Sequence, residues 1–170
     1  MRLSNPIFKA RVFVILLSGL GFLMVLGAPS LAAGGHFFLS ALVYTVFSPI
    51  CHQMPERSFE LLGFPWAVCH RCCGIYLGVL LAAVFYTAIP RRLTSHEMRR
   101  YWVAAATAPI LMDVGLTAAG VWNNAPLSRL CTGFLFGSML SSLLVPAFSE
   151  FLQPWNLSRC RTTEIQGGAW

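Results

Sequence analysis

Runs of apolar residues long enough to form membrane helices place the strongest constraint on the fold of this chain. Only 11% of the 170 residues are charged, and the mean hydropathy is +0.67. A soluble domain, by contrast, is about a quarter charged. The sequence therefore predicts an all-α integral membrane protein. The formal charge of +6 does not indicate nucleic-acid binding, because the basic residues cluster at the ends of the apolar runs.

Four of these runs predict transmembrane helices, at residues 12–28, 73–89, 101–120 and 131–152. Each is close to the ~20 residues that a membrane helix needs. A fifth run, residues 36–50, is too short to span the bilayer, and its aromatic side chains are typical of the membrane interface. We therefore expect a short interfacial helix there, packed beside a bundle of four transmembrane helices.

The first apolar run has two interpretations. Basic residues precede it, and Ser30-Leu31-Ala32 fits the small-residue cleavage site of a secretory signal peptide. However, the run is longer than the ~7–15 residues of a signal-peptide core, which favours an uncleaved span that ends at Pro29. Both interpretations place residue 34 and the segment after it outside the cytoplasm.

The distribution of lysine and arginine predicts the orientation in the membrane. Basic residues are more frequent in cytoplasmic loops than in outer ones. The orientation that obeys this rule has nine basic positions inside (2, 9, 11, 91, 92, 99, 100, 159 and 161) and three outside, Arg57, Arg71 and Arg129. We therefore expect a multi-pass protein of the bacterial cytoplasmic (inner) membrane. Both termini and the tail 153–170 would be cytoplasmic, and the loop 51–72 would be extracytoplasmic.

The outer loop carries a cysteine and histidine pattern typical of a metal site. Two thiolates of a C-x-x-C motif can bind one tetrahedral ion, and a third thiolate or an imidazole can complete its coordination. Zinc or another thiophilic metal is the cofactor that such ligands suit. The candidate ligands are Cys51, Cys69 and Cys72, with His52 or His70.

The same cysteines are compatible with two other roles, which spacing alone does not separate. One is a structural disulfide that staples the helical bundle, since this side of a cytoplasmic membrane is often oxidising. The other is a redox-active thiol pair. A helix N-terminus and Arg71 beside Cys69 and Cys72 would lower a thiol pKa. Four helices with outward thiols are similar in layout to quinone-linked thiol oxidoreductases such as vitamin K epoxide reductase, which implies a quinone as the cofactor of that alternative.

Acidic and basic residues near the outer surface form the remaining candidate site. Asp113 is the only acid in the middle of a predicted span, where a charge is costly and usually paired or functional. Arg129 precedes the last span and is the partner we expect. Together with Arg57 and Arg71, these residues are candidates for catalysis or for binding a lipid phosphate or another anionic substrate, because the guanidinium fork suits such groups. None of these patterns identifies an enzyme activity.

Pairs of glycines four residues apart occur in two of the predicted spans. They are Gly74 with Gly78 and Gly133 with Gly137. Small residues at this spacing let two helix backbones approach closely in a membrane. We expect them to pack the bundle, and the same faces would also suit a homo-oligomer.

The motifs together resemble a prokaryotic family of predicted membrane proteins, catalogued as domain of unknown function 2085. The resemblance extends from about Tyr44 to Gly137. It implies the topology and the positions of the motifs, and no activity. The residues that carry it are Cys51, His52, Gln53, Pro55, Arg57, Ser58, Cys69, Arg71, Cys72, Gly74, Tyr76, Asp113, Asn123, Arg129, Thr132 and Gly133.

Overall fold

The computed structural model describes residues 5–86, 96–121 and 125–152. Most of them are helical. The elements in chain order are α1 (Pro6–Ala33), α2 (Phe37–Phe47), the 3-10 turn η1 (Pro55–Arg57), β1 (Ser58–Leu61), β2 (Phe64–Cys69), α3 (His70–Phe85), α4 (His96–Ala118) and α5 (Pro126–Phe151). The basic positions 91 and 92, Asn123 and the predicted cytoplasmic tail 153–170 lie outside the described residues.

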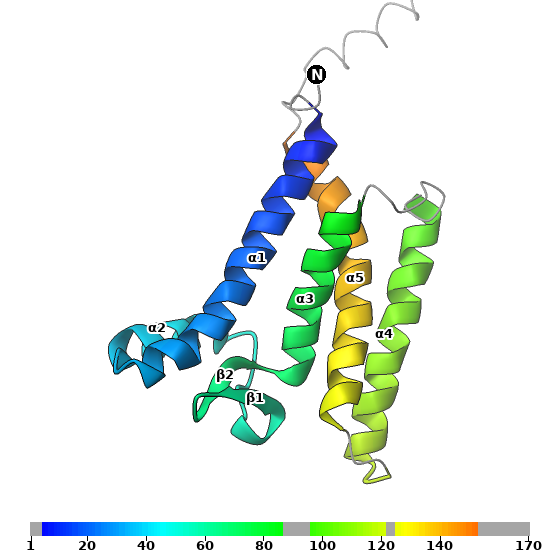
Figure 1. Ribbon diagram of the computed structural model, residues 1–170. Coiled ribbons are helices and arrows are strands. Elements are labelled where there is room, and N and C mark those ends of the chain that lie inside the picture. The colour runs from blue at the N-terminus through cyan, green and yellow to red at the C-terminus, as the bar shows by residue number, and fades with distance from the viewer. Residues whose placement is uncertain (1–4, 87–95, 122–124, 153–170) are drawn as a thin grey trace, which may run out of the picture.

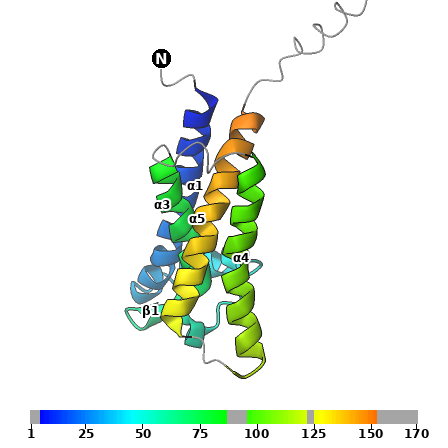
Figure 2. The same ribbon diagram turned by 90° about the vertical axis from the view of Figure 1, so that its right-hand side faces the viewer.

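The long helices α1, α3, α4 and α5 run side by side, whereas α2 turns away from the bundle (Figure 1). α5 packs against α1, α3 and α4, and its most extensive contact is with α3. The second view shows α5 between α3 and α4 (Figure 2). The β-hairpin formed by β1 and β2 covers one end of the bundle, between the end of α2 and the start of α3.

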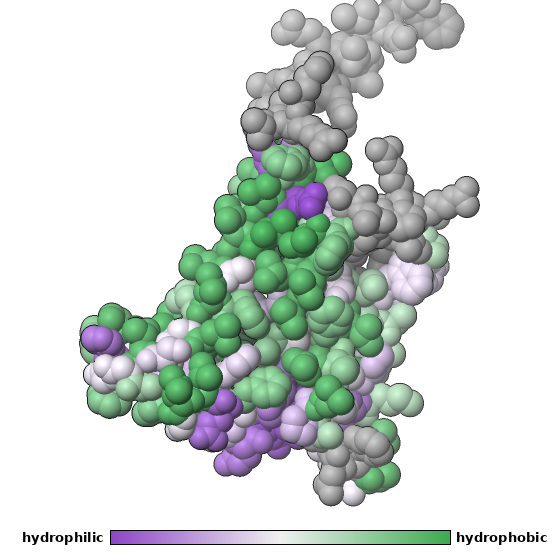
Figure 3. Space-filling view, in the orientation of Figure 1, coloured by the Kyte–Doolittle hydropathy of each residue, from purple (hydrophilic) through white to green (hydrophobic). Residues whose placement is uncertain are grey.

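Two of the helices, α1 and α5, are long and apolar enough to cross a membrane. The helix α3 and the apolar part of α4, Ala104–Ala118, are shorter. Large apolar side chains nevertheless point outward from the bundle, among them Leu16 and Leu20 of α1. Hydrophobic residues cover its flank, and hydrophilic ones gather at the hairpin end (Figure 3). Such a surface suits a bilayer better than water, since contiguous exposed apolar patches are small on soluble proteins.

The first helix does not end at Pro29, as the sequence led us to expect. α1 continues through this proline to Ala33, and Pro29 itself is buried. α4 and α5 likewise contain an interior proline, Pro109 and Pro146. Membrane helices tolerate such prolines, because neighbouring helices and polar side chains compensate for the lost backbone hydrogen bond.

The loop 51–72 departs from the predicted all-α fold, because it contains an antiparallel hairpin. Leu61 of β1 pairs with Phe64 of β2, so the turn has only two residues, Leu62 and Gly63. Their φ angles are +55° and +81°, and positive φ at both central positions is the geometry that two-residue hairpins favour. The usual signal of such a turn is Asn-Gly or Asp-Gly, whereas this chain has Leu62-Gly63, and leucine rarely adopts this conformation. The sequence therefore did not predict the hairpin.

The glycines of α3 and α5 form a close helix-helix contact, here called the glycine seam (Gly74, Gly78, Gly133 and Gly137). A Cβ atom at Gly133 would lie 2.2 Å from the carbonyl oxygen of Arg71, and one at Gly74 would lie 2.3 Å from that of Leu130. Any larger residue would therefore push the two backbones apart. The prediction that these glycines pack the bundle is confirmed. Because they face each other within one chain, they do not support the predicted oligomer contact.

Candidate metal centre

Three cysteines from separate parts of the sequence meet at the hairpin end of the bundle. The sulfur atoms of Cys51, Cys69 and Cys72, here called the cysteine trio, all lie within 4.8 Å of one another. Cys51 is buried, and the other two are partly exposed. Three tetrahedral thiolates at about 2.3 Å from a shared zinc ion would be about 3.8 Å apart. The trio is therefore within about 1 Å of the spacing that a metal requires.

Local backbone structure explains why the trio meets. The backbone N–H of Cys51 donates to the carbonyl of Phe47 at 2.9 Å, which fixes this cysteine to the end of α2. Cys69 ends β2 and is also the N-cap residue of α3, and Cys72 lies in the first turn of that helix. The N–H of Cys69 then donates to the Cys51 sulfur at 3.2 Å. The backbone N–H of the N-cap residue, which has no partner within α3 itself, is thus bonded to the Cys51 sulfur.

Gln53 holds the loop in this position, a role that the sequence did not reveal. Its side-chain amide donates to the carbonyl oxygens of Tyr44, at 2.7 Å, and of Ala67, at 2.9 Å. The Tyr44 hydroxyl donates in turn to the carbonyl of Pro65. These bonds tie α2, whose end is followed by Cys51, to β2, which ends at Cys69. Gln53 has a φ of +50°, a strained conformation for a residue other than glycine. Such strain is often found at functional sites. The backbone angle can be seen only in the structure, so the sequence could not reveal this role.

The trio favours one negative charge. Hydrogen bonds from the Cys51 and Cys72 thiols lower the pKa of Cys69, so Cys69 is the first thiol of the group to lose its proton. The same contacts raise the pKa of Cys72, which keeps its proton and donates it to the neighbouring sulfur. A thiolate held by neighbouring donors is the form that binds metal ions or attacks disulfides.

The two predicted histidine ligands occupy different environments. His52 is exposed and lines the same cavity as the trio. His70 is buried, with its ring edge-on to that of Phe59 at a centroid distance of 4.3 Å. Burial, together with the positive charge of Arg129, lowers the pKa of His70, which favours the neutral imidazole. Neither imidazole belongs to the group whose ligand atoms all lie within 4.8 Å.

The ion pair at the hairpin end of the bundle involves a different arginine from the one that the sequence suggested. Asp113 Oδ2 of α4 lies 2.5 Å from Arg71 Nη2 of α3, whereas we expected Arg129 as its partner. The Ser128 hydroxyl of α5 donates to Asp113 Oδ1 at 2.9 Å. Arg71 stands in the first turn of α3, next to Cys72 in the sequence. The carboxylate of Asp113 therefore joins three helices beside the cysteines.

A polar cavity opens next to the trio, here called the arginine cavity. It has a volume of about 340 Å³, and all three cysteines of the trio line it together with His52 and Gln53. The three arginines that we predicted to lie outside, Arg57, Arg71 and Arg129, also line it. The structure thus brings every predicted site residue except His70 and Asp113 to one cavity. Asp113 forms an ion pair with Arg71, which lines that cavity.

Comparison with known proteins agrees with the resemblance that the motifs suggested. A family described as "Predicted membrane protein (DUF2085)" matches residues 51–143. This chain belongs to that family. An uncharacterised protein of the archaeon Methanocaldococcus jannaschii is 35% identical over 115 residues, which cover 68% of this chain and 74% of the relative. An uncharacterised protein of Methanothermobacter thermautotrophicus is 43% identical over 97 residues, 57% of this chain and 86% of that protein. No solved structure matches the chain.

The part of the chain that is shared with the DUF2085 family contains the whole candidate site. The match begins at Cys51, the first cysteine of the trio, and continues through the hairpin, α3 and α4 into α5. It therefore includes the trio, the Arg71–Asp113 pair and the glycine seam. The helices α1 and α2 precede it.

Proposed function

We propose that this DUF2085 protein binds a thiophilic metal ion, such as zinc, through Cys51, Cys69 and Cys72. The observation that supports the proposal is the distance of at most 4.8 Å between the three sulfur atoms, which come from the segment after α2, from the end of β2 and from the first turn of α3. Three protein ligands with one open position are typical of a metal that handles a further ligand, whereas closed four-ligand sites are structural. His52 lines the arginine cavity together with the trio, and it is the protein group that would supply a fourth ligand.

Metal analysis of cysteine variants tests the proposal. The protein is purified in detergent without oxygen, and the zinc content per chain and the number of free thiols are measured on the same sample. Cys51→Ser, Cys69→Ser and Cys72→Ser should each lose the metal, because a site with only two thiolates binds far more weakly. The matched control is Cys131→Ser, since Cys131 is an exposed cysteine of α5 outside the trio. A wild-type protein without metal and with all its thiols free would contradict the proposal.

The second candidate function is thiol–disulfide exchange in the membrane. The Cys69 thiolate, with two further thiols within 4.8 Å, also suits this chemistry. Two of the three thiols would form a disulfide and pass two electrons and two protons to a quinone, which becomes a quinol. This candidate predicts metal-free protein that loses two free thiols per chain when a soluble quinone is added. Protein that keeps its metal and its thiols under the same treatment would exclude it.

We further propose that α1, α3, α4 and α5 all span the cytoplasmic membrane, with the trio on the outer side. The support is the asymmetry of basic residues, three of which lie at the hairpin end as Arg57, Arg71 and Arg129. A single cysteine at position 131 in an otherwise cysteine-free chain should react with a membrane-impermeant maleimide on intact cells. A single cysteine at position 160 should not react until the cells are lysed. The reverse pattern would overturn this topology.

A further inference from the structure

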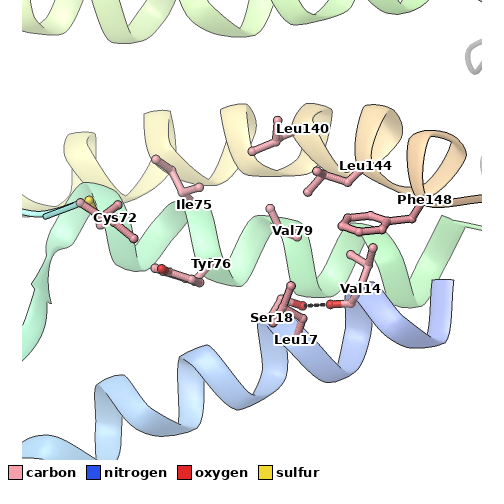
Figure 4. Close-up of a pocket in the computed structure, with 11 residues that line it drawn as sticks. Val14, Leu17, Ser18, Cys72, Ile75, Tyr76, Val79, Leu140, Leu144 and Phe148 are labelled. Carbon is pink, nitrogen blue, oxygen red and sulfur yellow. Dashed lines mark hydrogen bonds between the residues drawn. The ribbon is translucent and has the colours of Figure 1, made fainter. Parts of the chain in front are cut away.

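A second cavity continues from the trio into the bundle and differs from the first in chemistry. This apolar cavity has a volume of about 350 Å³ and lies between α1, α3 and α5. Figure 4 shows it extending from Cys72 along α3 toward Val14 and Phe148. Apart from Ser18, Cys72 and Tyr76, its lining is aliphatic or phenylalanine, and the Ser18 hydroxyl is turned to the carbonyl of Val14 at 2.6 Å. The cavity therefore offers almost no hydrogen bonds to a ligand.

The two cavities share a border. Ile50 and Cys72 line both of them, so the arginine cavity and the apolar cavity meet at the start of α3. From Cys72 to Val79 the helix rises about 10 Å along its axis. A ligand that filled both spaces would thus have a polar group at the hairpin end and an apolar chain parallel to the helices. A membrane lipid has the same arrangement, with its head group at the surface and its chains toward the bilayer centre.

The charges of the arginine cavity select an anionic head group. Arg57 and Arg129 form no ion pair within the residues that the structure describes. Arg71 binds Asp113 through Nη2, but its Nε is buried and has no hydrogen-bond partner in the described part of the chain. Three guanidinium groups line the cavity, and the one ion pair that the described residues show among them is that of Arg71 with Asp113, so positive charge is in excess there. Planar guanidinium forks fit the oxygen atoms of a phosphate, and basic pockets between membrane helices bind phosphate head groups.

We propose that the two cavities together bind one lipid that carries a phosphate head group. The phosphate lies among Arg57, Arg71 and Arg129, beside the trio. An acyl chain extends past Cys72 into the space between α1, α3 and α5. The head group gains charge-assisted hydrogen bonds, and the chain fills an apolar cavity whose volume falls in the range of ligand sites. This site does not require a metal on the trio, so it stands independently of the proposed metal binding.

Binding of defined lipids to the full-length protein in detergent tests the proposal. The probes are dioleoylphosphatidic acid, dioleoylglycerol, which has the chains without the phosphate, and inorganic phosphate, which has the head without the chains. Native mass spectrometry gives the bound stoichiometry, and the thermal shift gives the apparent affinity. We expect one phosphatidic acid per chain, bound at least about ten-fold more tightly than either of the other probes, because each of them lacks one half of the contacts.

Variants of the two halves locate the ligand. Arg57→Gln and Arg129→Gln should each weaken phosphatidic acid binding about ten-fold or more, since each removes a hydrogen bond to a charged group. Leu144→Phe fills the apolar cavity, so it should weaken phosphatidic acid binding and leave binding of inorganic phosphate unchanged. Lys9→Gln is the matched control, because it removes one exposed positive charge from the opposite end of α1 and should have no effect. Leu140→Phe replaces Leu144→Phe if the latter lowers the melting temperature of the lipid-free protein.

Three results would overturn the proposal. If Arg129→Gln and Arg57→Gln bind phosphatidic acid as tightly as the wild type, the head group is elsewhere. If inorganic phosphate binds as tightly as phosphatidic acid, the site accepts a free anion and no lipid. If dioleoylglycerol binds as tightly, the arginines do not recognise the ligand. The metal content, measured on the same samples, separates a failure of this proposal from a failure of metal binding.

Discussion

The two sides of α3 are packed in opposite ways. On the α5 side, a Cβ added to any glycine of the seam would lie within 2.3 Å of a backbone carbonyl oxygen of the other helix. On the α1 side, the glycines meet only side chains. A Cβ at Gly21 would lie 3.3 Å from the Tyr76 ring, and one at Gly19 would lie 3.8 Å from Leu80. The apolar cavity also lies on this side of α3, and the Tyr76 side chain lines it.

This difference shows how one helix can both position a site and leave space for a ligand. The seam sets the distance from α3 to α5, and so it positions Arg71 of α3 and Ser128 of α5, which both contact Asp113. The α1 side is filled by side chains that can change rotamer. We therefore expect substitutions on the α5 side to cost stability, and substitutions on the α1 side to change binding instead.

The largest loss should follow from removing the charge of Asp113. Asp113→Asn leaves Arg71 without its carboxylate, and breaking a buried ion pair costs about 3–5 kcal/mol of unfolding free energy. Because the Arg71 side chain is 24% exposed, we expect a loss of unfolding free energy at the lower end of that range. Unfolding in detergent, followed by circular dichroism, measures the change. The double variant Asp113→Asn with Arg71→Gln should recover part of the loss, whereas Asp113→Asn with Arg129→Gln should not. If the double variant with Arg129→Gln recovers stability and the one with Arg71→Gln does not, the partner of Asp113 is Arg129, as the sequence suggested.

A methyl group in the seam should have the next largest effect. Gly133→Ala places a Cβ 2.2 Å from the Arg71 carbonyl oxygen, so the helices must separate. We expect a loss of about 2–3 kcal/mol, the range of overpacked cores. Gly27→Ala is the matched control in α1, because no atom lies within 4 Å of its new Cβ. Equal stability of the two variants would show that the seam is not closely packed.

A smaller loss should follow from removing the Gln53 amide. Gln53→Ala deletes two hydrogen bonds to backbone carbonyls, and each contributes about 0.5–1.5 kcal/mol. We expect a loss of about 1–2 kcal/mol and a lower zinc affinity at the trio, since α2 and β2 are no longer tied together. Equilibrium dialysis against zinc measures the second effect. Gln153→Ala is the control substitution. If Gln153→Ala has an effect as large as that of Gln53→Ala, Gln53 has no specific role in holding the loop.

Filling the apolar cavity should change stability least. Leu144→Phe adds volume where the structure already has space, so the unfolding free energy should change by less than about 1 kcal/mol, at the tolerant end of core substitutions. The same unfolding measurement checks it, with Gly133→Ala as the contrasting variant. A loss as large as that of Gly133→Ala would show that the α1 side is as rigid as the α5 side.

Sequence patterns predicted the helices and the meeting of the three cysteines better than the partners of individual side chains. Hydropathy locates apolar helices because the signal is summed over many residues. The C-x-x-C spacing places Cys69 and Cys72 one helical turn apart, and the cysteine pattern grouped Cys51 with them as candidate ligands of one metal ion. The hairpin was missed because its turn depends on Leu62, a residue that disfavours positive φ. The partner of Asp113 depends on how α3 and α4 are rotated about their axes, which no local pattern encodes.

The histidines illustrate the same limit. His52 and His70 are each adjacent to a cysteine of the trio, so spacing makes both plausible ligands. The structure turns His70 toward Phe59 and leaves His52 at the arginine cavity. A difference of one or two residues at the start of a helix decides which way a side chain points. Composition cannot resolve that choice.

The glycine seam also sets an order of assembly. Its two halves are not consecutive helices, since α4 lies between α3 and α5 in the chain. From Gly74 to Gly133 the ribosome must add 59 residues, which takes roughly 3–12 s at 5–20 residues per second. During that interval α3 lacks its closest neighbour, and until Asp113 of α4 has been added Arg71 also lacks the carboxylate that pairs with it. The cation of Arg71 is therefore paired when α4 arrives, and the glycine seam closes later, when α5 arrives.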